Sequence, residues 1–300
     1  MKGIILAGGS GTRLYPITEG ISKQLMPIYD KPMIYYPLST LMECGINEVL
    51  IITTNQDLPS FKRALKDGEQ FGIHIEYAIQ KYPRGIAEAL IIGENFLDND
   101  DCMLILGDNI FIGDELKDIT RKARLNAKMG IATNYMIPVK DPQRFGVAEI
   151  NSQGQIIGIE EKPEKPKSNL ALVGLYTFPN DACYYAKNLK PSSRNELEIT
   201  DLSKEFLYDG LLKGCLLSNT KWFDTGTFTS EYEAIKYIYN IENKLKKVIP
   251  CIEEIAYENG WITLDGLLDR SILLSKNSYG EYLKKFASEK KLVLQKKDNQ

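Results

Sequence analysis

A glycine-rich run that contains one cation and is followed by another is the segment of this 300-residue chain best suited to chemistry. Residues 8–14 read GGSGTRL, so Arg13 lies inside the run, and Lys23 follows it. Glycines allow close approach of a ligand to the main chain, whose N–H groups at the end of a strand can hold phosphate oxygens. Arg13 can bridge two such oxygens, and Lys23 adds a point charge. The run favours a triphosphate site, with an ordinary glycine-rich turn as the alternative.

Two common nucleotide-binding motifs do not fit this run. A Walker A loop requires Gly-Lys-Ser or Gly-Lys-Thr, which does not follow here. The dinucleotide fingerprint requires a glycine where Leu14 stands, and no acidic residue ends a second strand about 20 residues later. Residues 31–34 (KPMI) are interpreted there as the start of a helix.

Two aspartates at the ends of apolar segments are candidate metal ligands. Asp108 ends the apolar run MLILGDN (residues 103–109), and Asp224 lies in WFDTGT (residues 222–227). Each could by itself be a turn or cap residue. Mg²⁺ takes one or two carboxylates and keeps its other positions for phosphate and water. With the glycine run, Asp108 and Asp224 favour metal-assisted transfer at a phosphate.

Composition excludes several other classes of protein. With 43% hydrophobic and 26% charged residues and a net charge of −3, the chain is typical of a globular protein with a large core and no nucleic-acid partner. It has no apolar run of eighteen residues, and residues 1–3 open directly into a strand, so neither a membrane span nor a signal peptide is expected. Five scattered cysteines without a Cys-x-x-Cys pair predict reduced thiols and a cytoplasmic location. The only histidine, His74, falls in an alternating strand and excludes histidine-dependent hydrolysis.

The order of elements predicts an α/β fold. Strands are expected at residues 3–6, 49–53, 73–78 and 103–106, and helices over 32–44, 57–67, 86–97 and 114–128. This alternation predicts a parallel sheet covered on both faces, with ligands outside the carboxyl ends of the strands. Further strands at 131–138, 147–150, 156–160 and 172–178 have short turns between them, which favours mixed or antiparallel pairing. Helices are expected from residue 229 to the end.

Longer segments resemble the sugar-phosphate nucleotidylyltransferases. Residues 6–14 and 22–27 are similar to the signature of that family. The resemblance extends to its glucose-1-phosphate thymidylyltransferase branch through residues 29–39, 106–109, 160–163, 196–201, 222–227, 253–257 and 276–283. It implies a three-layer, Rossmann-like nucleotide-diphospho-sugar transferase fold with a mostly parallel sheet. Residues 1–228 would form the catalytic domain, with a nucleotide half (about 1–130) and an antiparallel sugar-phosphate half (about 131–228), and residues 229–300 a helical region for oligomerisation or regulation.

The resemblance also implies the reaction. An oxygen of glucose 1-phosphate attacks the α-phosphorus of dTTP in line, pyrophosphate leaves, and dTDP-glucose forms, which is the first step towards dTDP-L-rhamnose. The attacking phosphate is already an anion, so catalysis rests on positioning and charge and requires no histidine. Arg13 would neutralise the pyrophosphate side and Lys23 would lie against the α-phosphate and the sugar phosphate. Asp108 and Asp224 would hold Mg²⁺.

Two sets of binding residues follow from the same resemblance. The nucleotide set consists of Leu6, Gly8, Gly9, Ser10, Gly11, Thr12, Arg13, Gln24, Gln80, Pro83, Gly85 and Asp108. The sugar-phosphate set consists of Asn109, Phe145, Gly146, Glu161, Lys162, Val173 and Tyr176. Lys162 would bind the sugar phosphate itself.

The sequence leaves open which base the protein selects. Gln80 is similar to the family glutamine that pairs with thymine, but thymine and uracil present the same edge to an amide. The chain departs from the family pattern at Arg84, where an acid is usual, and at Phe145, where a tyrosine is usual. A UTP-using or nucleotide-promiscuous enzyme is therefore one alternative, and a non-catalytic sugar-nucleotide sensor another. The resemblance finally implies a homotetramer with a regulatory nucleotide site occupied by dTDP-rhamnose.

Overall fold

A central sheet organises the protein in the computed structural model, which describes residues 1–9 and 11–298. The described part of this sheet has nine strands. They are β1 (Lys2–Leu6), β4 (Glu48–Thr53), β5 (His74–Ile79), β6 (Cys102–Leu106), β8 (Ala132–Pro138), β9 (Gly146–Ile150), β10 (Ile156–Glu161), β11 (Leu170–Phe178) and β12 (Leu212–Leu216). Two small ladders join β2 (Pro27–Ile28) to β3 (Lys31–Pro32), and β7 (Asn109–Ile112) to β13 (Lys221–Asp224).

The strand order is β10-β9-β11-β6-β1-β4-β5, with β8 beside β11 and β12 beside β8. Strand β1 pairs in parallel with β4 and β6, and β4 pairs in parallel with β5, as the sequence predicts. Strand β11 runs antiparallel to β6, so the antiparallel strands continue the parallel sheet at one side instead of forming a second sheet. The predicted α/β fold with a parallel centre is confirmed.

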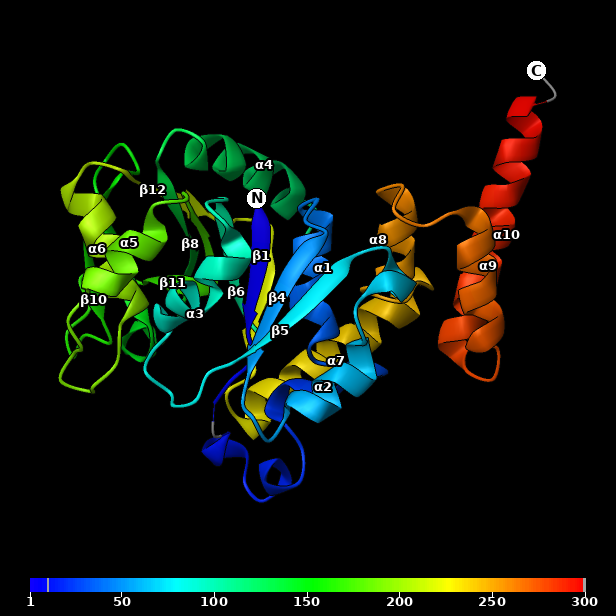
Figure 1. The fold of residues 1–300 in the computed structure, drawn as a ribbon, viewed down its shortest axis with the longest axis horizontal. Helices are drawn as coiled ribbons and strands as arrows, with labels where there is room; N and C mark the ends of the chain where they lie inside the picture. The colour runs from blue at the N-terminus through cyan, green and yellow to red at the C-terminus, as the bar shows by residue number, and fades with distance from the viewer. Residues whose placement is uncertain (10, 299–300) are drawn as a thin grey trace.

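Helices cover both faces of the sheet (Figure 1). The described helices longer than a single turn are α1 (Tyr35–Glu43), α2 (Leu58–Leu65), α3 (Glu88–Leu97), α4 (Glu115–Ala127), α5 (Ala182–Asn188), α6 (Ile199–Tyr208), α7 (Phe228–Leu245), α8 (Ile252–Glu258), α9 (Leu264–Leu273) and α10 (Ser278–Asp298). Helices α1, α2, α4 and α8 pack on one face, and α3, α5 and α6 pack on the other. The result is the expected three-layer arrangement.

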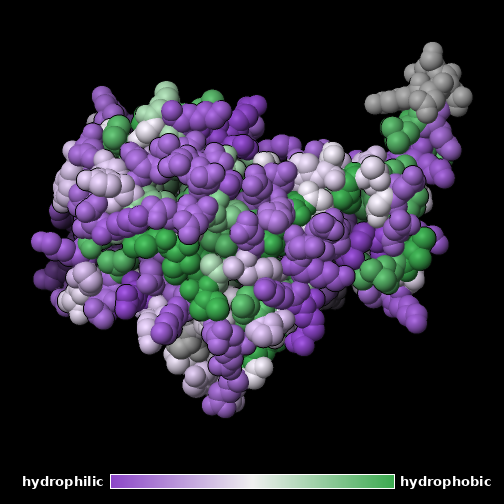
Figure 2. All heavy atoms as spheres, viewed as in Figure 1, coloured by the Kyte–Doolittle hydropathy of each residue, from purple (hydrophilic) through white to green (hydrophobic). Residues whose placement is uncertain are grey.

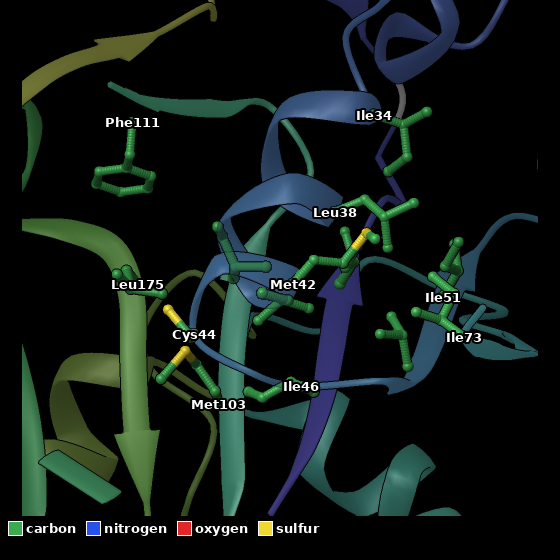
Figure 3. Packing of buried hydrophobic residues seen from close by; sticks show 14 of the residues in the cluster. Ile34, Leu38, Met42, Cys44, Ile46, Ile51, Ile73, Met103, Phe111 and Leu175 are labelled. Atoms are coloured by element: carbon green, nitrogen blue, oxygen red, sulfur yellow. The ribbon is translucent and has the colours of Figure 1, made fainter. Parts of the chain in front are cut away.

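Alternation along the strands divides the core between these two faces. Ile5 and Ile51 belong to the cluster under α1, whereas Ile4 and Leu50 belong to the cluster under α3. Successive side chains of a strand point to opposite faces, so each strand of the parallel centre must be apolar throughout. Figure 3 shows the first cluster, in which α1 packs its apolar side chains against the strands. This double-sided burial fixes the strands whose ends carry the site.

The predicted helix over residues 32–44 is wrong at its start. Helix α1 begins at Tyr35, and Lys31–Pro32 forms the short strand β3 opposite Pro27–Ile28. The reason is a buried ion pair. The Lys31 ammonium, on a residue only 3% exposed, lies 2.8 Å from a carboxylate oxygen of Glu242 in α7 and 2.5 Å from one of Asp30. This contact across the chain fixes the local backbone before the helix starts.

Removal of the Lys31 ammonium is expected to destabilise the fold. Lys31→Ala leaves the carboxylate of Glu242 buried without its cation, and loss of one partner of such a pair costs about 3–5 kcal/mol of unfolding free energy. The matched control is Lys187→Ala, because Lys187 forms an equally short pair with Glu94 that is almost half exposed. The control is expected to cost no more than about 1 kcal/mol. Denaturant unfolding of both variants checks this, and equal losses would contradict it.

The C-terminal helices extend from the body of the molecule at the right of Figure 1. Helices α8, α9 and α10 share a small apolar cluster that includes Leu267 and Leu283. Apolar atoms are also visible on the outside of this region in Figure 2. Ile272 and Leu273 are 69% and 71% exposed there. No helix within the described residues is long and apolar enough to cross a membrane.

Candidate active site

The site lies where β1 and β6 end. The two strands run parallel with Leu6 opposite Leu106, so the segments that follow them leave the sheet at the same edge. The backbone N–H of Gly107 donates to the carbonyl of Leu6 over 2.9 Å, which ties the two exits together. The glycine loop and Asp108 therefore meet, as the sequence predicts from the parallel register.

Backbone conformation explains two of the glycines in the loop. Gly9 has φ 134° and Gly11 has φ 59°, values in the region that favours glycine. Gly11 also lies directly before the short 3₁₀ helix η1 (Thr12–Leu14), and its carbonyl accepts a 2.8 Å hydrogen bond from the Thr18 hydroxyl. Glycine at these two positions thus permits a backbone conformation that other residues rarely adopt. Ser10, which belongs to the predicted nucleotide set, lies outside the described residues.

The β7–β13 ladder brings the two aspartates together. Asn109 in β7 stands opposite Asp224 in β13, which places Asp224 next to Asp108. Thr225 strengthens this junction, because its backbone N–H and its hydroxyl both donate to the Asp108 carbonyl, over 3.2 and 2.8 Å. Aspartates separated by more than a hundred residues are thus adjacent at the edge of the glycine loop.

Asp108 and Asp224 have opposite pKa shifts. Burial alone would raise the pKa of Asp108, but the Lys23 ammonium 2.5 Å away and the Asn109 amide 3.0 Å away outweigh it, so the pKa is lowered. Burial raises the pKa of Asp224, and the negative charge of Asp108 raises it further, although Lys23, Arg144 and Arg13 oppose this. Two carboxylates that repel each other in a partly buried site are suited to a shared cation.

A cavity of about 240 Å³ joins these groups. Its lining includes Arg13, Lys23, Gln24, Asp108 and Asp224, together with glycines of the loop and Gly226. A Cβ on Gly226 would lie 3.2 Å from an Asp224 oxygen and 3.4 Å from the Arg13 guanidinium, which shows how closely the three approach. The four residues predicted to act in catalysis share this one cavity.

A second cavity of about 530 Å³ continues from the first on the side of β5. The two share Gly9, Gly11 and Lys23, and the second is also lined by Gln80 and Pro83. Their combined lining includes nine of the twelve residues of the predicted nucleotide set. Leu6 and Gly85 are not among the lining residues, although the Gly85 carbonyl accepts a hydrogen bond from the Gln80 amide over 3.3 Å. This side of the cleft is thus continuous with the glycine loop.

Near this second cavity, Gly85 lies in a crowded position, whereas Arg84 is exposed. The φ of Gly85 is 100°, and a Cβ there would lie 2.4 Å from the carbonyl oxygen of Leu197, so the position requires glycine. Arg84 is exposed, and its guanidinium lies 5.8 Å from the centre of the Tyr82 ring. The Arg84 guanidinium, which departs from the family pattern, therefore lies over a neighbouring aromatic ring.

Apart from Asn109, which lies in β7, the predicted sugar-phosphate residues lie on β9, β10 and β11 or directly beside these strands. Gly146 stands opposite Glu161 in the β9–β10 ladder, and a Cβ on Gly146 would lie 2.6 Å from a Thr200 carbon. Lys162 follows with φ 44°, and its backbone N–H donates to the Phe145 carbonyl over 3.0 Å. A positive φ is unfavourable for residues other than glycine, so contacts with the surrounding residues must stabilise the Lys162 backbone.

The remaining members of this set are buried. Val173 and Tyr176 lie in β11, and burial, followed by the charge of Glu161, raises the pKa of Tyr176. The Asn109 side chain makes three hydrogen bonds with other residues of the protein. It donates to Asp108 and accepts from the Trp222 indole over 2.7 Å and from a backbone N–H of β11. Asn109 thus orients Asp108, a contact that the sequence did not indicate.

Comparisons with known proteins agree with this geometry. A family model described as nucleotidyl transferase matches residues 2–240. The chain is 51% identical to the glucose-1-phosphate thymidylyltransferase of Neisseria meningitidis and 48% identical to that of Mycobacterium tuberculosis, in both cases over 94% of this chain and 98% of the relative. The chain belongs to the glucose-1-phosphate thymidylyltransferase family of nucleotidyl transferases. The family inferred from the sequence is confirmed.

Solved structures extend the comparison to the fold. A putative glucose-1-phosphate thymidylyltransferase from Bacillus anthracis, in complex with a sucrose, is 41% identical, with a TM-score of 0.74 over 79% of this chain and 94% of that one. A UDP-glucose pyrophosphorylase complexed with UDP-glucose is 28% identical, with a TM-score of 0.70 over 80% of this chain and 98% of that one. As a member of this family, the protein is a nucleotidyltransferase.

Nucleotidyl transferases generally use a divalent metal, and the carboxylate pair fits one. No group of three or more His, Cys, Asp or Glu side chains gathers as a metal cage within the described residues. A cage is not required, because a cation that keeps phosphate and water ligands needs only one or two carboxylates. Asp108 and Asp224 supply this number.

The sequence analysis did not predict that two arginines, Arg144 and Arg194, lie near the candidate site residues. Arg144 lies 3.4 Å from an oxygen of Asp224, and Arg194 lies 3.0 Å from an oxygen of Glu161. Thr200 also donates to Glu161, over 3.1 Å. Arg144 directly precedes the Phe145-Gly146 pair of the predicted set, which is a local signal, whereas nothing near Arg194 in the sequence indicates Glu161 as its partner.

Proposed function

We propose that the protein condenses dTTP and α-D-glucose 1-phosphate into dTDP-glucose and pyrophosphate. The observation that carries this proposal is the Asp108–Asp224 pair, which shares one cavity with Arg13, Lys23 and the glycine loop. The high identity to glucose-1-phosphate thymidylyltransferases supports the choice of substrates. A sensor without turnover would have no use for paired carboxylates facing two cations.

The reaction requires no proton transfer. An oxygen of the sugar phosphate, already anionic, attacks the α-phosphorus of dTTP. The bond from the α-phosphorus to the α,β-bridging oxygen breaks, and that oxygen leaves with pyrophosphate. Catalysis then depends on holding two anions in line and compensating the charge that moves to the leaving group. The only histidine, His74, is exposed on β5 and takes no part.

Charged residues around the cavity supply this compensation. Asp108 and Asp224 would hold Mg²⁺, which when bound neutralises phosphate oxygens as a Lewis acid. Arg13 would bind the pyrophosphate side through its forked guanidinium. Lys23 pairs with Asp108 and would also contact the α-phosphate and sugar phosphate, so it links the acidic and phosphate sides of the site.

The second half of the cleft would bind the sugar phosphate. The Glu161 carboxylate, fixed by Thr200 and Arg194, would accept hydrogen bonds from hexose hydroxyls. Gly146, Val173 and Tyr176 would shape the pocket around the ring, with Asn109 and Phe145 at its border. Lys162 would bind the sugar phosphate, because its constrained backbone directs it beside Glu161, with the ammonium 3.5 Å from a Glu161 oxygen.

The triphosphate that the enzyme selects can be measured directly. Pyrophosphate release is followed with glucose 1-phosphate, Mg²⁺ and, separately, dTTP, UTP, CTP, ATP and GTP. We expect the largest kcat/KM with dTTP. A larger value with UTP would keep the chemistry but assign a uridylyl enzyme, as in the UDP-glucose pyrophosphorylase of similar fold. No turnover with any triphosphate would contradict the proposal.

We further propose a homotetramer in which residues 229–300 serve assembly and residues 1–228 catalysis. Aromatic side chains on α7 support an interface with a second copy, since Phe228, Tyr232 and Tyr239 are exposed along the helix. Sedimentation velocity at micromolar concentration tests this, and a monomer would exclude it. The five cysteines are unpaired, which supports a cytoplasmic enzyme that starts dTDP-L-rhamnose synthesis.

A further inference from the structure

The guanidinium of Arg144 lies between two carboxylates at the border of the sugar half. Arg144 ends the short 3₁₀ helix η5 (Pro142–Arg144), directly before Phe145 of the predicted sugar-phosphate set. Its nitrogen Nη1 donates to the Asp141 carboxylate over 2.8 Å, and Nη2 donates to Oδ2 of Asp224 over 3.4 Å. The guanidinium also lies 5.2 Å from the centre of the Phe145 ring. Arg144 therefore connects the segment before the sugar residues with a carboxylate of the 240 Å³ cavity.

Asp224 is a carboxylate that Arg144 would have to share with a bound cation. Among the described residues, the ion pair with Arg144 is the only one that Asp224 forms. A divalent cation would lie about 2 Å from a carboxylate oxygen, so it would be only a few ångströms from the guanidinium. Both groups are positive, and each therefore weakens the binding of the other to Asp224.

Exposure distinguishes Arg144 from the cation that pairs with Asp108. The Lys23 side chain there is 10% exposed, whereas the Arg144 side chain is 42% exposed. A solvated guanidinium can leave a carboxylate at 3.4 Å with little loss, because water replaces the contact. The contact of Nη1 with Asp141 is the shorter of the two. Nη2 is thus the donor that can change its partner while Asp141 holds the rest of the group.

We propose that Arg144 competes with the divalent cation for Asp224, and that its displaced Nη2 binds the phosphate of the sugar substrate. In-line attack requires that phosphate to lie between the α-phosphate at Asp224 and the sugar residues that begin at Phe145, and Arg144 contacts both residues. A guanidinium suits the exchange, because the same N–H donors bind carboxylate and phosphate oxygens. This inference rests on the proposed function, from which it takes the cation and the sugar phosphate.

Equilibrium binding of Mn²⁺ alone, followed by electron paramagnetic resonance, tests the competition. Arg144→Ala should bind Mn²⁺ about tenfold more tightly than wild type, because a neighbouring positive charge is removed. Arg144→Lys keeps that charge and should stay close to wild type. The matched control is Arg121→Ala. Arg121 also pairs with the aspartate three residues before it, Asp118, but on the exposed surface of α4, so its loss should leave the Mn²⁺ affinity unchanged.

Calorimetric binding of glucose 1-phosphate at saturating Mg²⁺ tests the second contact. Arg144→Ala should bind it about 10–100-fold more weakly, the loss expected for one hydrogen bond between charged groups. Arg144→Lys should recover part of this affinity, since it restores the charge without the forked geometry. General damage to the site would weaken the binding of both ligands, whereas the inference requires changes of opposite sign.

Two results would overturn the inference. One is equal or weaker Mn²⁺ binding by Arg144→Ala, and the other is unchanged binding of glucose 1-phosphate by a variant that is compared with a binding wild type. Absence of glucose 1-phosphate binding by wild type itself would instead contradict the proposed function. The two failures are therefore distinguishable without any measurement of turnover.

Discussion

Asp108→Asn is expected to lower kcat about 10³-fold while the fold is retained. Loss of a preorganised charge at a phosphoryl centre costs about 10²–10³ in rate, and here the same change weakens cation binding and leaves Lys23 without its carboxylate. The amide of asparagine is nearly isosteric with the carboxylate. The lost rate is therefore assigned to charge and not to packing.

The measurement is kcat with saturating Mg²⁺, dTTP and glucose 1-phosphate. The control is Asp118→Asn, because Asp118 is 76% exposed on α4 and pairs only with the equally exposed Arg121 among the ion pairs of the described residues. It should leave kcat unchanged. If Asp108→Asn retained most of its activity, the assignment of Asp108 to the cation would be wrong.

Arg13→Ala is expected to produce a second loss of about 10³-fold in kcat. An arginine that compensates charge on a leaving phosphate contributes about 10³–10⁵ in rate. Arg13 lines the cavity close to Asp224, and it is the one charged residue in the sequence of the glycine-rich run, residues 8–14. Arg13→Lys should recover part of the rate, because it restores the charge but not the two-pronged contact.

The control for Arg13 is Arg121→Ala, which removes a guanidinium from an exposed helix surface. It is expected to leave kcat and both KM values unchanged. Full activity in Arg13→Lys would show that a point charge is sufficient. A rise in KM for dTTP at unchanged kcat in Arg13→Ala would instead mean that Arg13 binds the nucleotide equally well before and during the reaction.

The first half of the fold follows from the sequence because its strands are apolar runs with clear ends. β1, β4, β5 and β6 lie within one or two residues of the predicted positions, and the parallel register brings Gly8 and Asp108 to one edge as expected. These elements are determined by local pattern and by burial on both faces, which a single sequence carries.

The rest depends on contacts between distant segments. The β7–β13 ladder, which joins Asp108 to Asp224, was not predicted, because strands this short form only against their partner. Helices α5 and α6 were not predicted either. The start of α1 was misplaced since Lys31 pairs with Glu242, about 210 residues later. The hydrogen bond from the Gln80 amide to the Glu88 carboxylate was also not predicted, because the strand and helix patterns do not indicate contacts between individual side chains.

The central claim is tested most directly by ³¹P NMR of the products formed from dTTP, glucose 1-phosphate and Mg²⁺. The account predicts dTDP-glucose and pyrophosphate in equal amounts, with no free dTMP, because the sugar phosphate is the attacking group at the α-phosphorus. Pyrophosphate accompanied by dTMP would show that water attacks in its place, and unchanged substrates would show that the paired aspartates do not support transfer. Either result would contradict the account.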